Sequence, residues 1–187
     1  MTTQYDILQF SSPLEEIQAC LRDPVYFINN FVRVRGETIT LNRNQLEWVQ
    51  DTYESQISRY GDERQTGRTT VSTAYSLWKA IFHTNQLVIF VAPNNNMSRY
   101  VRELFVDMLN SLPNWMQPDT LENNYRCLKM TNASTVLFQN AGSPGFLRGF
   151  SPTLVVHDVV NCFPSESRSA LRSTIAALPK SSHIIIG

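Results

Sequence analysis

DERQTGRTT (residues 62–70), followed directly by VSTAYSLWKAIFHT (71–84), is the most informative stretch of the sequence. Apolar residues recur at helical spacing in the second segment, so a turn containing Gly67 opens a helix. The first N–H groups of a helix are unpaired and favour an anion, most often phosphate. Arg68 supplies a cation and Thr69 a hydroxyl suited to magnesium. The pattern therefore predicts a phosphate-binding loop.

A second interpretation of this stretch stays open. The usual phosphate-loop pattern carries glycine where Asp62 stands and lysine where Arg68 stands. Asp62 and Glu63 also bring negative charge near a site meant for phosphates. An ordinary helix start, capped by Thr69 or Thr70, would give the same local sequence.

Composition narrows the class of protein. A chain of 187 residues predicts one domain. Lys+Arg 16 balances Asp+Glu 16, so bulk charge does not indicate non-specific nucleic-acid binding. No signal peptide or apolar run of membrane-spanning length is evident, so we expect no membrane partner. The scattered cysteines Cys20, Cys127 and Cys162 indicate reduced thiols in a cytosolic protein.

Three apolar runs set the expected architecture: QLVIFVA (86–92), residues 153–158 and residues 183–186. Their length and β-branching predict strands that are buried on both faces. Helical segments separate them, so the sequence predicts an α/β domain with these runs in one mostly parallel sheet. Residues 125–139 predict a hairpin.

The remaining segments are interpreted mainly as helices. Ser12 and Pro13 begin one helix, and Pro24 ends or interrupts it. Further helices are predicted over VYFINNFVRV (25–34), over NRNQLEWVQDTYESQISRY (42–60), after the cap formed by 94–96, and over 164–178.

TLVVHDVV (153–160) is the second chemically informative stretch. Asp158 ends an apolar strand, and ligands of open α/β sheets bind at the carboxyl ends of strands. Beside a phosphate loop, such a carboxylate holds magnesium. The alternative is a strand-end Asp that caps a turn. Hydrolysis usually needs a further carboxylate to orient water, but the next residue is Val159, and the placement of Glu166 cannot be fixed from sequence.

With these pieces in order, the chain resembles the N-terminal ATPase domain of tailed-phage terminase large subunits, with the T4-like group as the closest match that can be named. The resemblance covers about 23–187. Six segments carry it in the same order: PVYFINNF (24–31), LNRNQLEWVQ (41–50), ERQTGRTT (63–70), SLPNWMQP (111–118), LRGFSPTLVVHD (147–158) and HIIIG (183–187).

The resemblance implies a phosphate-loop NTPase fold with one domain over 1–187: a helical segment at 1–35, a core at 36–187, and no nuclease domain. It implies a function as the ATP-binding domain of a viral DNA-packaging motor, with ATP and Mg²⁺ as cofactors. The implied partners are double-stranded DNA within the assembled motor, the portal protein and other terminase subunits, in the host cytoplasm.

The resemblance also implies the site residues. Gln45 becomes the glutamine that recognises the base, and Arg64 the arginine that contacts phosphate. Arg64 and Asp158 are the expected catalytic residues, Thr69 and Asp158 the expected metal ligands. The loop residues expected to bind the nucleotide are Gln65, Thr66, Gly67, Arg68, Thr69 and Thr70.

Departures from the family pattern bear on catalysis. Arg68 replaces its lysine and Val159 its glutamate, and QISRYGDE (56–63) is too polar for the strand expected before the loop. A guanidinium is wider than an ammonium, and loss of a general base typically costs about 10²–10⁴-fold in rate. We therefore expect ATP hydrolysis to be slow or lost. A non-catalytic relative that binds nucleotide or protein, or a helicase-like nucleic-acid ATPase, remains an alternative.

Overall fold

The computed structural model describes residues 12–61, 66–142 and 147–187. Within them, a seven-stranded sheet has the order β3-β9-β8-β4-β7-β6-β5, beside a separate two-stranded ribbon, β1-β2. Pairing is parallel from β3 through β7 and antiparallel for β5 and β6. The sheet strands are β3 (Ile57–Tyr60), β4 (Leu87–Ala92), β5 (Thr120–Asn123), β6 (Cys127–Met130), β7 (Thr135–Asn140), β8 (Leu154–His157) and β9 (Ser182–Ile186).

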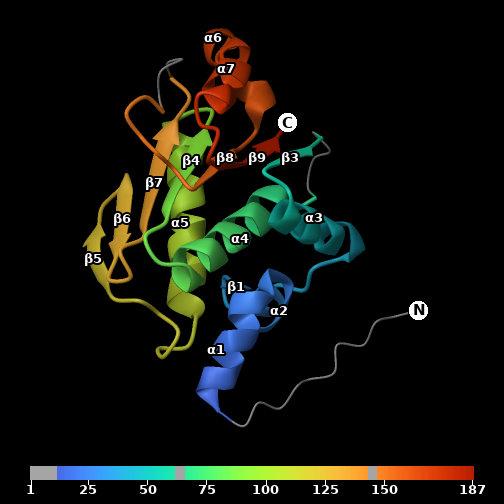
Figure 1. Ribbon diagram of the computed structural model, residues 1–187, viewed down its shortest axis with the longest axis vertical. Helices are drawn as coiled ribbons and strands as arrows, with labels where there is room; N and C mark the ends of the chain where they lie inside the picture. Colours follow the sequence, from blue (N-terminus) through green and yellow to red (C-terminus); the bar gives the residue numbers. More distant parts are fainter. Residues whose placement is uncertain (1–11, 62–65, 143–146) are drawn as a thin grey trace.

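Helices cover both faces of this sheet (Figure 1). One face carries α1 (Pro13–Arg22), α2 (Pro24–Phe31), α3 (Arg43–Glu54), α4 (Arg68–Phe82) and α5 (Asn95–Ser111). The other face is covered by η1 (Val160–Cys162), α6 (Ser165–Ser169) and α7 (Leu171–Ala176). The ribbon strand β1 (Arg33–Val34) lies against α5, and its partner β2 (Glu37–Thr38) lies against α2. The predicted α/β fold with a mostly parallel sheet is confirmed.

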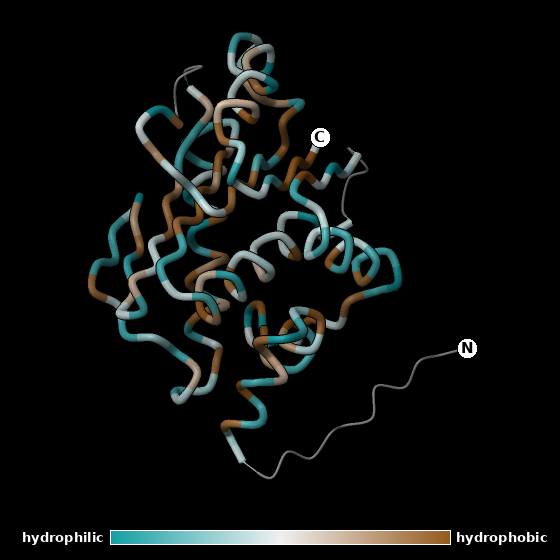
Figure 2. The backbone as a smooth tube through the Cα atoms, viewed as in Figure 1, coloured by the Kyte–Doolittle hydropathy of each residue, from teal (hydrophilic) through white to brown (hydrophobic). Residues whose placement is uncertain are grey.

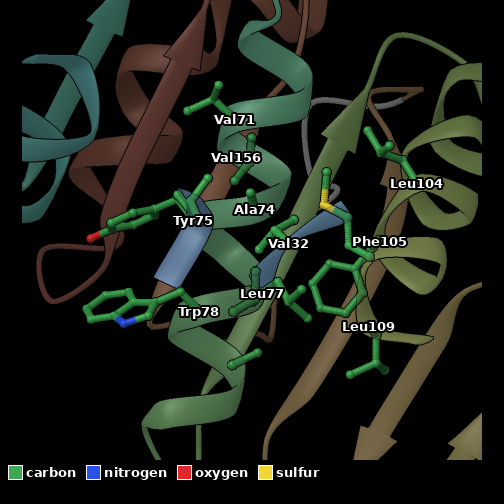
Figure 3. Close-up of a cluster of buried hydrophobic side chains, with 14 of the residues drawn as sticks. Val32, Val71, Ala74, Tyr75, Leu77, Trp78, Leu104, Phe105, Leu109 and Val156 are labelled. Carbon is green, nitrogen blue, oxygen red and sulfur yellow. The ribbon is translucent and has the colours of Figure 1, made fainter. Parts of the chain in front are cut away.

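The main core lies between the sheet and α4 (Figure 3). Leu77 and Trp78 of α4 are buried with Val156 of β8 and Phe105 of α5. The indole Nε1 of Trp78 also donates to the carbonyl oxygen of Cys20 at 2.7 Å, which ties α1 to α4. Hydrophobic residues follow the central strands in Figure 2, as expected for strands covered on both faces.

The three apolar runs are neighbours in the sheet. Val88 of β4 pairs with Leu154 of β8, and Val155 of β8 pairs with His183 of β9, both in parallel register. The hairpin of β6 and β7 is also confirmed. Strand β5 was not predicted; all four of its residues are exposed, so no apolar pattern marks it.

The prediction of a helix over 42–60 is wrong in its last part. Helix α3 ends at Glu54, and Ile57–Tyr60 form β3, which pairs in parallel with β9. The judgement that this segment was too polar for a strand is therefore also wrong. β3 is bonded to one neighbour and alternates in burial, with Ser58 buried and Ile57 40% exposed. A strand at such an edge needs little apolar sequence.

Two other helix predictions need correction. The helix predicted over 25–34 ends at Phe31, and Arg33–Val34 enter the ribbon. The helix predicted over 164–178 is broken at Ala170 into α6 and α7. Serine hydroxyls bond to backbone carbonyls of the same segment: Ser169 donates to the carbonyl of Ser165 at 2.8 Å, and Ser173 to that of Ala170 at 2.8 Å.

Candidate functional site

The turn before α4 has the geometry of a helix start, where the first N–H groups lack intrahelical partners. Gly67 is the N-cap residue, with φ 72° and ψ 18°, and it makes no side-chain cap. Its carbonyl accepts the first helical bond, from Val71 N at 2.9 Å. Glycine adopts this left-handed backbone at little cost, which explains why it stands at this position. The long helix that follows directs its N-terminus toward the carboxyl ends of the parallel strands.

The two residues predicted as metal ligands are in direct contact. Thr69 Oγ1 donates a hydrogen bond to Asp158 Oδ1 at 2.8 Å, although 89 positions separate them in the chain. Thr69 lies in the first turn of α4, and Asp158 directly follows β8. The first turn of α4 and the end of β8 therefore bring a hydroxyl and a carboxylate into contact.

Asp158 is held where a carboxylate is poorly solvated. It is 1% exposed, and burial raises its pKa, an effect that the Thr69 hydrogen bond opposes. Its second oxygen, Oδ2, is buried and has no hydrogen-bond partner among the described residues. A carboxylate oxygen in this state fits a hard cation such as Mg²⁺, which commonly takes one or two protein carboxylates plus phosphate oxygens and water. The described residues contain no group of three or more His, Cys, Asp or Glu side chains that could hold a metal ion.

The residue after this aspartate is strained. Val159 has φ 55° and ψ 56°, the left-handed region, and it starts the 3₁₀ turn η1. That conformation is a genuine outlier for a β-branched residue. Strain of this kind persists only where the surrounding structure imposes it, and it concentrates at functional sites. Its side chain offers no group that could take a proton.

A cavity of about 530 Å³ opens beside the loop, between α3 and β3. Gln45, Thr66 and Arg68 line it together with Trp48 and Tyr60. The predicted base-recognition residue Gln45 and the loop residues Thr66 and Arg68 therefore line the same cavity. A base bound there would lie next to the phosphate loop, but the role of each residue stays a prediction.

Gln45 is already hydrogen-bonded at both ends of its side-chain amide. Oε1 accepts from Asn42 N at 3.0 Å, and Nε2 donates to the carbonyl oxygen of Thr66 at 2.9 Å. Asn42 in turn accepts from Gln45 N, so the two residues form a capping box at the start of α3. Sequence reasoning missed this role for Asn42. The signal was present, since an N-cap residue followed three positions later by Gln is the capping-box pattern.

Other predicted site residues are more scattered. Thr70 lines a different cavity, of about 690 Å³, between α5 and the β1–β2 ribbon. Arg64 and Gln65 lie outside the described residues, so their predicted roles stay predictions.

A buried histidine pair lies on the opposite face of the sheet. His157 Nε2 and His183 Nδ1 are 3.2 Å apart, with the rings stacked. Burial, with a smaller contribution from the charge of His183, lowers the pKa of His157 to about 3, and burial also lowers the pKa of His183. His157 is fully buried, as a core histidine is. No local sequence pattern indicates that His183 contacts it.

Solved structures of phage terminases have the same fold. The large terminase of bacteriophage HK97 superposes with a TM-score of 0.72 at 18% identity, over 89% of this chain and 37% of that one. The Thermus phage P74-26 large terminase ATPase domain gives 0.63 at 17% identity, over 79% and 64%. The large terminase of bacteriophage D6E in complex with ADP gives 0.57 at 14% identity, over 79% and 38%.

These likenesses show that the chain has the fold of these large terminase structures. The chain spans less than two thirds of each of these proteins. No family model matches the sequence. The narrower T4-like assignment stays a prediction. No helix in the described part of the chain is long and apolar enough to cross a membrane.

Proposed function

We propose that this chain is the nucleotide-binding domain of a viral DNA-packaging motor, the ATPase domain of a terminase large subunit. The observation that carries the proposal is the hydrogen bond of 2.8 Å between Thr69 and Asp158 at the N-terminus of α4. The other oxygen of Asp158 is buried without a hydrogen-bond partner among the described residues. That favours a metal ligand over an aspartate that only caps a turn. The shared fold of the phage terminases supports the same conclusion.

The proposed ligand is ATP with Mg²⁺. Two structures of the D6E large terminase are complexes with ADP and with ATP-gamma-S, which supports a nucleotide as the ligand. The N–H groups that follow Gly67 bind phosphate, and Arg68 adds positive charge. Thr69 and Asp158 hold the metal ion, which neutralises phosphate charge when bound. Gln45 contacts the loop at the edge of the cavity, and Arg64 and Gln65 complete the loop by resemblance.

Catalysis is proposed to be slow or lost. An arginine stands where a compact lysine would fit between phosphates. Val159 occupies the position beside Asp158 from which a carboxylate would orient water, and its backbone is strained. These two features favour a second candidate function, a relative that binds nucleotide without turning it over.

The proposed partners are double-stranded DNA, contacted only within an assembled motor, together with the portal protein and other terminase subunits. The proposed location is the host cytoplasm. A groove of about 550 Å³ lined by Arg99 and Arg126 is a surface suited to phosphate backbones, since none of the described residues lining it is acidic. Net charge is zero, so this local surface would have to supply the attraction.

The proposal is tested by thermal unfolding with and without nucleotide, followed by phosphate release. Saturating MgADP or MgATP-γ-S should raise the melting temperature, because a ligand at 100 times its Kd stabilises by about 2.7 kcal/mol. MgATP should then show little or no phosphate release. Stabilisation without turnover supports the binding-only relative, and fast turnover supports a working ATPase. No stabilisation by any nucleotide would contradict both.

A further inference from the structure

The groove lined by Arg99 and Arg126 lies at the carboxyl end of β7, beside the N-terminal part of α5. Strand β7 packs against α5 and pairs with β6, and the three elements are neighbours in Figure 1. In the sheet order, only β4 separates β7 from β8, which leads into Asp158. The groove therefore shares the carboxyl edge of the parallel strands with the candidate metal site, the edge where ligands of such sheets bind.

The positive charge of the groove is uncompensated within the described part of the chain. Arg99 and Arg126 are both exposed, and neither forms an ion pair with a described residue. The described residues that line the groove include no carboxylate. Both guanidinium groups are therefore available to anionic groups of a ligand, and phosphates are the anions that a guanidinium fork fits well.

An aromatic ring stands beside these cations. Tyr125 lines the groove and is 69% exposed, and Cζ of Arg126 lies 5.1 Å from the centre of its ring. The partly buried Leu137 and Phe150 add apolar surface to the same groove. A phosphate chain alone gains nothing from a ring or from apolar side chains. The bases of an unpaired strand do, because every base has a flat face that stacks on an aromatic ring.

The turn that carries Tyr125 and Arg126 is fastened to α5. Arg102 Nε donates to the carbonyl oxygen of Asn124 at 2.7 Å, and its Nη2 donates to Asn123 Oδ1. Asn124 Oδ1 in turn accepts from the backbone N–H of Arg126 at 2.9 Å. The backbone that presents the ring is thus held in place before a ligand arrives, which lowers the entropy cost of binding.

We propose that this groove binds a single strand of nucleic acid, with a base stacked on Tyr125 and phosphates on Arg99 and Arg126. It rests on the proposed function for the class of partner and adds the form that the isolated chain binds. Bases within a duplex are stacked on their neighbours and must be extruded to reach a protein ring. A volume of about 550 Å³ is that of an ordinary small-ligand pocket, which suits an unpaired nucleotide and not the face of a duplex.

The test measures fluorescence anisotropy with the whole chain and three labelled probes of equal length: an oligothymidylate, an abasic strand with the same phosphates, and a duplex. The variants are Tyr125→Ala, Tyr125→Phe and Arg126→Ala. Tyr100→Ala is the matched control, because Tyr100 is next to Arg99 in α5 and 44% exposed but lines the separate cavity beside the β1–β2 ribbon.

The wild type should bind the oligothymidylate more tightly than the abasic strand or the duplex. Tyr125→Ala should weaken the oligothymidylate by about fivefold or more, the effect of one lost stacking contact, and leave the abasic strand unchanged. Tyr125→Phe and Tyr100→Ala should keep the wild-type affinities. Two phosphate contacts predict a slope of log K against log salt of about −1.4, which Arg126→Ala should reduce to about −0.7.

Equal affinity for the oligothymidylate and the abasic strand would show that charge alone acts, and it would overturn the proposal. Tighter binding of the duplex, or an unchanged affinity in Tyr125→Ala, would overturn it as well, as would a wild type that binds none of the three probes. Stabilisation by MgADP, measured on the same protein, decides the nucleotide function separately. If MgADP has no effect while the oligothymidylate binds through Tyr125, the nucleotide function fails and the groove proposal stands.

Discussion

Replacing Thr69 by valine removes one hydroxyl and keeps the shape of the side chain. The lost hydrogen bond is 2.8 Å long and its acceptor, Asp158, is a buried carboxylate. Hydrogen bonds to charged groups contribute roughly 1.5–3 kcal/mol. With about 2 kcal/mol lost, and a shift of about 2–4 °C per kcal/mol for a domain of this size, Thr69→Val should lower the melting temperature by about 4–8 °C.

The measurement is calorimetric unfolding at pH 7.5 without nucleotide, with Thr69→Ser as the control that keeps the hydroxyl. Serine should lose much less than valine. The gap between the two variants should narrow as the pH is lowered, because burial raises the pKa of Asp158 and a protonated carboxyl no longer gains from a charge-assisted bond. Equal stability of Thr69→Val and Thr69→Ser at pH 7.5 would refute the reasoning.

Three further predictions follow from the same structure. Val159→Gly should raise the free energy of unfolding by about 1 kcal/mol in urea titration, since glycine relieves the left-handed strain at some entropic cost; a less stable variant would argue against strain. Arg68→Lys combined with Val159→Glu should raise phosphate release above that of the parent, with neither change sufficient alone; equal release in the parent would mean that the base is misplaced. A thiol reagent should label the exposed Cys162 in the native protein but reach Cys20 only after unfolding, because burial and nearby acidic groups raise the pKa of Cys20 to about 12; rapid native labelling of Cys20 would contradict its burial.

The central sheet was predictable because its strands are apolar along almost their whole length. Strands buried on both faces must be apolar along their whole length, so 86–92, 153–158 and 183–186 stood out. β3 was not predictable by that criterion, because it is an edge strand and half of its side chains are exposed, so it needs few apolar residues. Its strand conformation comes from pairing with β9, more than 120 residues away in the chain, and no local pattern records such a partner.

The candidate site shows a similar division. Thr69 and Asp158 were both identified from local patterns, and the structure places them in contact. The contact of Gln45 with the Thr66 carbonyl was not foreseen, because it depends on where α3 sits relative to α4. The left-handed backbone of Val159 could not be predicted from the sequence either, because β-branched residues rarely adopt it.

The most direct test of the account is the magnesium dependence of nucleotide binding in the wild type and in Asp158→Asn. The amide keeps an acceptor for Thr69 but removes the negative charge offered to the metal. Calorimetry with ADP should show binding to the wild type that needs Mg²⁺, with a Kd weaker than about 1 μM, and no magnesium-dependent heat in the variant. Equal magnesium-dependent heats in the two proteins, with matching melting curves, would contradict the assignment of Asp158 and Thr69 as the nucleotide's metal site.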